Sequence, residues 1–344
     1  MLNESAKLPK VKDSLIEQIL LGNKLTPELI AILTIYFVQG ILMLSRLAVS
    51  FFLKDELLLS PAQMSAIIGI STIPWMIKPL YGFIADILPL FGYHRKTYIF
   101  LSGIIGSAAW VGLGTIVHSS SIATMMILLC SLSVALSDVI VDSIVVERAR
   151  SESAEKLGSL QSLCWGIAAI GGLCTAYLSG LLLEYFTTRT VFLITALFPI
   201  ITSFVAWLIT EKPINKDEKK SDDIKYQLVQ IRQAITQKAI WLPTVFIFVW
   251  HATPNAESAF FYFTTNELQF QPEFLGRVRL VTSFASLIGI WAFQRYFKTI
   301  PFRTMFTWGI FISTALGMTT LLLVTHTNRL LGIDDHWFSL GDNL

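Results

Sequence analysis

The sequence contains little charge for its length. Aspartate, glutamate, lysine and arginine make up 15% of the 344 residues, whereas apolar residues make up 53%. The mean hydropathy is +0.62. A soluble chain of this size needs more charge than this to cover its surface. The composition therefore excludes an ordinary soluble domain and predicts a membrane protein.

Several motifs of soluble chemistry are also missing. The sequence has no Gly-x4-Gly-Lys-Ser/Thr loop, so we do not expect it to drive transport with ATP. It has no His-Glu-x2-His pair and no Gly-x-Ser-x-Gly elbow, so we expect no enzyme activity. Cys130, Cys164 and Cys174 are odd in number and lack metal-ligand spacing. We therefore expect no disulfide framework, metal, cofactor or nucleic acid partner.

The apolar residues occur in long blocks rather than in amphipathic stripes. A bilayer core of about 30 Å needs about 20 apolar helical residues to cross it. Helices are expected because a lone strand leaves its backbone polar groups unsatisfied in lipid. The nine predicted spans are 30–53, 64–88, 97–117, 122–146, 158–183, 190–209, 240–263, 276–297 and 303–325. The pattern predicts an all-α polytopic membrane protein.

The stretch before the first span, residues 1–29, is polar and mixed in charge. It contains Glu4, Asp13, Glu17 and Glu28 among its lysines, which argues against a cleaved signal peptide and against an acid-poor transit peptide. We expect a cytosolic segment with a short amphipathic helix near 13–21 that lies on the membrane surface.

Basic residues are concentrated on alternate loops. The richer set holds the lysines before the first span, Arg95 and Lys96, Arg148, Arg150 and Lys156, the linker 211–238, and Arg295, Lys298 and Arg303. The poorer set holds Lys54, Arg189 and Arg329, with Arg277 and Arg279 near the start of the eighth span. This pattern predicts a cytosolic N-terminus. The linker divides a six-helix half, 30–210, from a second, partial half, 239–344.

A repeat crosses the linker at a shift of 211 residues. The first copy contains Phe52, Glu56, Leu57, Pro61, Met64 and Ser65, and the second contains Phe263, Glu267, Leu268, Pro272, Leu275 and Gly276. The same shift aligns Arg46 with Glu257. Two six-helix halves in parallel resemble the major facilitator superfamily. Because the second half has about three helices, we expect a major facilitator fold that is truncated in its second half.

The loop after the second span contains a candidate conformational latch. Gly82 and Asp86 end the span, and Arg95 and Lys96 follow it. This resembles the Gly-x3-Asp and basic cluster of the superfamily, although the spacing is longer. The basic cluster could pair with acids near the end of the fourth span, where Glu147 and Arg148 lie, and so bias which side opens. Ordinary positive-inside topology also explains the basic residues.

Five charged residues lie within the apolar blocks: Arg46, Lys78, Asp138, Asp142 and Glu257. Such a residue costs about 2.5–3.5 kcal/mol at a helix centre, so each should face the protein interior or a watery cavity. Asp138 and Asp142 are four residues apart and share one helix face. Like charges at short range oppose joint ionisation, which suits a proton-coupling site. A structural ion pair with Arg46 or Lys78 explains them equally well.

The seventh span contains a proline among polar side chains. Pro254 bends the helix and frees a carbonyl group, and His251, Asn255 and Glu257 surround the bend. Freed backbone at membrane depth lines a cavity or is buried in protein. The span therefore has features of a binding cavity, although a packing kink is the alternative.

Four stretches carry a family resemblance. They are residues 75–82 (WMIKPLYG), 137–150 (SDVIVDSIVVERAR), 158–166 (GSLQSLCWG) and 260–268 (FFYFTTNEL). Together they closely resemble the folate–biopterin transporter family of the major facilitator superfamily. The resemblance implies twelve helices and transport of folates or related pterins, with a proton as the coupled ion. It also implies a bacterial-type inner membrane, and we expect a monomer.

The resemblance gives the charged residues expected roles. Arg46 and Lys78 would bind the carboxylates of a folate through charge-assisted hydrogen bonds. Asp138, Asp142 or Glu257 would hold the pterin amino and ring N–H groups or take the coupled proton. Another organic anion on the same scaffold is the alternative substrate, and a truncated, non-transporting receptor is the alternative function.

Overall fold

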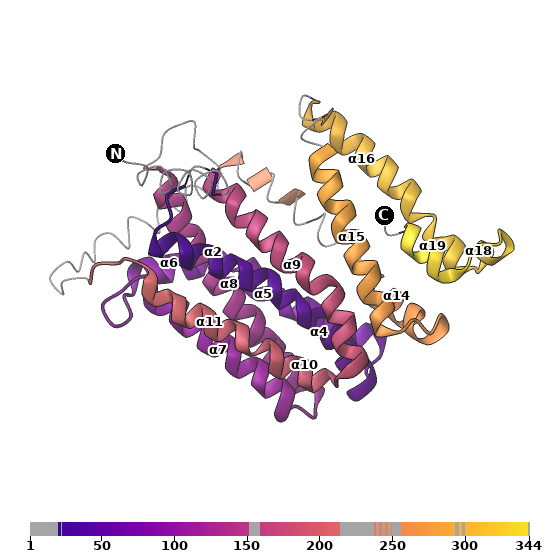
Figure 1. Ribbon diagram of the computed structural model, residues 1–344, viewed down its shortest axis with the longest axis horizontal. Helices are drawn as coiled ribbons and strands as arrows, with labels where there is room; N and C mark the ends of the chain where they lie inside the picture. The colour runs from indigo at the N-terminus through magenta and orange to yellow at the C-terminus, as the bar shows by residue number, and fades with distance from the viewer. Residues whose placement is uncertain are drawn as a thin grey trace, which may run out of the picture.

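The described residues form a bundle of helices (Figure 1). The computed structural model describes residues 20–21, 23–150, 159–213, 237–238, 241–242, 245–246, 249, 256–292, 296–297 and 300–342. Among these residues, seven helical segments are long and apolar enough to cross a membrane: Pro27–Glu56, Pro61–Ile87, Lys96–Thr115, Ser120–Arg148, Ser159–Tyr185, Thr188–Leu208 and Arg303–Val324. The prediction of a polytopic helical membrane protein is confirmed.

The first six spans form the first half. They comprise α2 (Pro27–Ile41), η1 (Leu42–Leu44), α3 (Ser45–Phe51) and η2 (Phe52–Glu56); α4 (Pro61–Ser71), α5 (Ile73–Met76) and α6 (Lys78–Ile87); α7 (Lys96–Thr115); α8 (Ser120–Arg150); α9 (Ser159–Tyr185); and α10 (Thr188–Thr195), α11 (Leu197–Val205) and η3 (Ala206–Leu208). Helix α7 packs against α8 and α11, and α9 packs against α2.

The second span is interrupted near its two prolines, where the sequence predicts a broken segment around Pro74, Lys78 and Pro79. Pro74 lies in the first turn of α5, and Pro79 lies in the first turn of α6. A proline is tolerated there because the amide it lacks has no intrahelical partner. The interruption places Lys78 at the first residue of α6, beside a break in the helix.

Two apolar clusters hold the first half together. One contains Leu29, Ile32 and Ile99. The other contains Phe52 and Phe192, whose rings meet edge to face with centroids 5.4 Å apart. Such aromatic pairs contribute about 0.5–1.5 kcal/mol beyond their burial. The two clusters fix the relative positions of the helices that carry the charged side chains.

The described part of the second half contains α14 (Glu257–Tyr262), η5 (Phe263–Glu267), α15 (Pro272–Ala292), α16 (Phe302–Gly317), α17 (Thr320–Val324), α18 (Thr327–Leu330) and α19 (Asp335–Asp342). Figure 1 shows α15 next to α9, with α16 to α19 beyond α15. The middle of the predicted seventh span, 240–263, lies outside the described residues, and His251 and Asn255 lie in that part.

The backbone repeats at the shift that the sequence predicts. Phe52–Glu56 and Phe263–Glu267 are both π-helical, and they are related by 211 residues. Leu58 and Gln269, also 211 apart, both adopt a left-handed conformation, with φ of 51° and 53°. Such angles are uncommon outside glycine, so their recurrence shows that the two turns are copies of one structure. We call the end of the bundle that carries these turns the outer end.

The two halves meet along α9 and α15, near the outer end. A Cβ atom on Gly180 would lie 2.2 Å from the carbonyl oxygen of Pro272 and 2.8 Å from Cα of Gly276. The Tyr177 hydroxyl donates a hydrogen bond of 3.1 Å to Glu273 beside this crossing. Small residues let membrane helices approach closely, so Gly180 and Gly276 set the distance between the halves.

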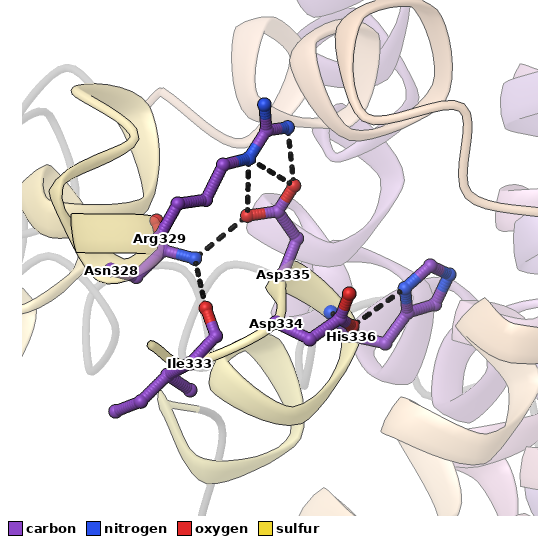
Figure 2. A network of polar contacts seen from close by, with 6 residues as sticks. All are labelled: Asn328, Arg329, Ile333, Asp334, Asp335 and His336. Carbon is purple, nitrogen blue, oxygen red and sulfur yellow. Dashed lines mark hydrogen bonds and ion pairs between the residues drawn. The ribbon is translucent and has the colours of Figure 1, made fainter. Parts of the chain in front are cut away.

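A polar network ties together the segment after α17 (Figure 2). Arg329 Nη2 donates to Asp335 Oδ2 at 2.6 Å, and Asn328 Nδ2 donates to Asp335 Oδ1 at 2.7 Å. The Arg329 guanidinium holds the pKa of Asp335 below its usual range. The imidazole of His336 lies 3.1 Å from Asp334 and contacts nearby aromatic rings. The network closes the turn between α18 and α19.

We expect Gly180→Ala to destabilise the protein by about 1–3 kcal/mol, because the added methyl group would force backbone atoms of α9 and α15 apart. Thermal unfolding in detergent measures this effect. Gly172→Ala on the same helix is the matched control, since its Cβ would meet nothing within 4 Å. Equal melting temperatures for the two variants would contradict the close crossing.

Candidate functional site

Three charged side chains gather between the two halves. Arg46 comes from α3, Glu257 from the start of α14, and Arg279 from α15. Arg279 is half-buried and interacts electrostatically with both Arg46 and Glu257. Arg46 and Glu257 are exposed. The cluster has two positive groups and one negative group, so its net charge is positive.

Arg279 is the member of this cluster that the sequence analysis missed. The sequence analysis groups Arg279 with the loops that hold few basic residues. The reason is that Arg279 lies near residue 276, where the eighth span is predicted to start. In the structure α15 begins at Pro272, which places Arg279 about two turns inside the helix. An arginine within a long helix of a membrane protein is itself a functional signal.

A second group of charges lies within the first half. Lys78 of α6 forms an ion pair with Asp138 of α8. The Lys78 ammonium also lies 4.3 Å from the ring centroid of Trp75. The side chains of Lys78 and Asp138 keep 25% and 13% of their exposure. The ion pair satisfies two of the five predicted membrane charges with each other.

Asp142 has a different partner. The hydroxyl of Tyr36 on α2 donates a hydrogen bond to it. Asp138, Lys78 and Cys164 lie within electrostatic range of the Asp142 carboxylate. Tyr36 was not expected to take part, because a tyrosine in an apolar run usually serves packing or anchoring. Asp142 therefore faces a neutral phenol directly, whereas Asp138 faces a cation.

The end of the bundle opposite the outer turns, which we call the inner end, contains the predicted latch residues. Arg95 forms an ion pair with Glu147, which joins the start of α7 to the end of α8. Arg148 donates a 3.2 Å hydrogen bond to Thr26, the residue that caps α2. A Cβ atom added to Gly82 would meet Val139 of α8 at an ordinary contact distance. Asp86 is exposed and pairs with no cation in the part of the chain that the structure describes.

Glu211 adds a contact that the sequence did not predict. Its carboxylate accepts hydrogen bonds from the backbone amides of His94, Arg95 and Lys96, at 2.7, 3.2 and 2.9 Å. These amides open α7, and a carboxylate there satisfies donors that have no partner within the helix. The side chain of Lys96 points elsewhere, over the rings of Tyr93 and Trp207.

Within the described ranges, no three His, Cys, Asp or Glu side chains gather as a metal site.

Comparisons with known proteins agree on the family. The model of the BT1 family matches residues 39–344. The chain is 59% identical to a folate-biopterin transporter of Synechocystis sp., over 97% of this chain and 67% of that protein. It is 30% identical to folate transporter 2 of Plasmodium falciparum, over 88% of this chain and 66% of that protein. The chain thus spans about two thirds of the length of these relatives.

A solved structure agrees on the fold. A bacterial homologue of the human lysosomal transporter Spinster, in an inward-facing and occupied conformation, superposes with a TM-score of 0.61. The two share 15% identity, over 93% of this chain and 73% of that one. The helical membrane fold of the major facilitator type is therefore confirmed.

We expect Lys78→Met to destabilise the protein by about 2–3 kcal/mol, because it leaves Asp138 with no cation inside the bundle. Adding Asp138→Asn should restore most of the loss, since the remaining pair is neutral. Thermal melting of the two single variants and the double variant gives the coupling. Additive losses would contradict a direct ion pair.

Proposed function

We propose that this chain, which belongs to the BT1 family, is a secondary transporter of folates or related pterins. Two relatives named above are described as folate or folate-biopterin transporters. The helical fold of major facilitator type supports the same class of activity. The proposal extends to a proton as the coupled ion and to a bacterial-type inner membrane with a cytosolic N-terminus.

The observation that carries the proposal is the family match over residues 39–344. The groups that we assign to the substrate are Arg46, Glu257 and Arg279, of which Arg279 lies within electrostatic range of the other two. A folate has a glutamate tail with carboxylates and a flat pterin ring with amino and N–H groups. Guanidinium groups bind carboxylates through paired, charge-assisted hydrogen bonds. The carboxylate of Glu257 can accept from the pterin donors. Because the residues come from different halves, a bound substrate would couple the movements of both halves.

The two halves contact each other at the outer end of the bundle. Lys54 Nζ donates to Asn266 Oδ1 at 3.0 Å, and the Tyr262 hydroxyl donates to the carbonyl of Leu59. The rings of Phe51 and Phe261 meet edge to face, with centroids 5.2 Å apart. Opening these contacts is the step that would admit a substrate from outside.

Asp142 is the residue we assign to proton coupling. Asp138 already has a cation as its direct partner, because it forms an ion pair with Lys78. Asp142 has only the Tyr36 hydroxyl in direct contact among the described side chains that surround it. A carboxylate with a neutral partner in a bilayer can exchange a proton without breaking an ion pair. This arrangement supports the role of Asp142 in coupling and a structural role for Asp138.

We expect Arg46→Ala to lower folate uptake by at least about tenfold, because a charge-assisted hydrogen bond to the substrate is lost. The measurement is uptake of labelled folate into proteoliposomes that hold the purified chain. Arg277→Ala is the matched control, since Arg277 is 60% exposed and pairs with Glu273 one turn away.

Unchanged uptake by Arg46→Ala, with normal protein yield, would remove Arg46 from the site. Competition of labelled folate by unlabelled pterins, nucleosides and peptides would test the substrate class separately. Strong competition by nucleosides or peptides, but not by pterins, would replace folate with another organic substrate on the same fold.

We expect Asp142→Asn to abolish proton-driven accumulation of folate while leaving counterflow exchange largely intact, because exchange needs substrate binding but no net proton movement. The measurement compares accumulation under an imposed pH gradient with counterflow in its absence. Glu184→Gln, at an exposed carboxylate of α9, is the matched control. Accumulation that survives in Asp142→Asn would assign the proton to another group.

A further inference from the structure

A small hollow lies at the inner end of the bundle, away from the charged cluster. It has a volume of about 250 Å³ and is lined by Phe91, Tyr93, Lys96, Phe100, Leu101 and Trp207. Most of this lining is apolar or aromatic. Pockets for drug-sized ligands begin at about 300 Å³, so this hollow is too small for a whole folate.

The hollow lies where two spans leave the membrane. Helix α7 starts at Lys96, and the sixth span ends at Leu208, on the same side of the bundle. Phe100 and Trp207 line the hollow, and their ring centroids are 6.0 Å apart. Trp207 is 62% exposed. Tryptophan and tyrosine concentrate at the level of lipid head groups, so the position places the hollow at the membrane interface.

Lys96 supplies the only cation of this lining. Its ammonium lies 5.0 Å from the ring centroid of Trp207 and 5.7 Å from that of Tyr93. The neighbouring charged groups have other partners. Arg95 pairs with Glu147, and the Glu211 carboxylate accepts hydrogen bonds from backbone amides. No carboxylate in the described part of the chain forms an ion pair with Lys96. Its ammonium group therefore lies over aromatic rings of the hollow.

The turn before α7 presents a further apolar ring. Phe91 has a left-handed backbone with φ of 53°, and Gly92 follows with φ of 84°. A bridge between Leu90 and Tyr93 closes the turn. The Phe91 side chain is 87% exposed, so few protein contacts offset the conformational cost of about 1–2 kcal/mol. A ring held out in this way at the interface is suited to insertion among lipid chains.

We propose that this hollow binds one anionic lipid of the surrounding bilayer. The Lys96 ammonium would pair with the phosphate or sulfonate of the head group, and the aromatic lining would hold a segment of an acyl chain. The charge of Lys96 favours an anionic lipid over a zwitterionic one. The site stands apart from the substrate cluster, so it does not depend on the transported molecule.

Native mass spectrometry of the purified chain tests the site, with phosphatidylglycerol and phosphatidylcholine added in equal amounts. The wild-type chain should retain more phosphatidylglycerol, and Lys96→Gln should lower that preference about fivefold. Lys96→Arg should keep it, because the charge remains. Lys24→Gln is the matched control, since Lys24 is an exposed lysine just before α2 at the same end.

A second variant tests the apolar part of the site. Trp207→Leu keeps the charge but removes a ring from the lining, so it should weaken retention of phosphatidylglycerol. Equal retention of both lipids by the wild-type chain would overturn the proposal, as would an unchanged preference in Lys96→Gln. Inorganic phosphate that displaces the lipid completely would show a site for soluble anions instead, and would also overturn it.

Discussion

The cost of a charge in a bilayer is the constraint on which the rest of this structure depends. Lys78 and Asp138 meet that cost by pairing with each other inside one half. Asp142 meets it with a tyrosine hydroxyl from a neighbouring helix. Each partner comes from a different helix, so these contacts also fix how the helices pack. On the surface of a soluble protein, such charges could lie almost anywhere. Here each charge needs a partner from another helix, and this need restricts which helices pack side by side.

The cluster between the halves obeys the same constraint in a different way. Arg46, Glu257 and Arg279 belong to separate halves, so their electrostatic balance changes whenever the halves separate. The close crossing at Gly180 keeps α9 and α15 in contact near the outer end. A tight crossing beside a charged cluster lets small rotations alter the distances between charges, whereas the pairs inside one half stay unchanged. Rigid halves and a variable interface are what alternating access requires.

Much of the fold could be predicted from the sequence, because hydropathy and loop charge act locally. The contacts were harder to predict, since they depend on how helices rotate about their axes. Tyr36 resembles any buried tyrosine until α2 is placed beside α8. Glu211 begins a charged linker and gives no local sign that it caps α7. Lys96 fits a basic cluster, yet its side chain lies over aromatic rings.

The internal repeat explains why Arg46 and Glu257 could be linked before their positions were known. In two parallel halves, equivalent positions near the axis between them face each other across that axis. The two π-helical turns at 52–56 and 263–267 show that the equivalence holds in the backbone. A charged residue near the axis in one half is therefore opposite its counterpart in the other half. Opposite signs at such a pair make the interface between the two halves electrostatically asymmetric.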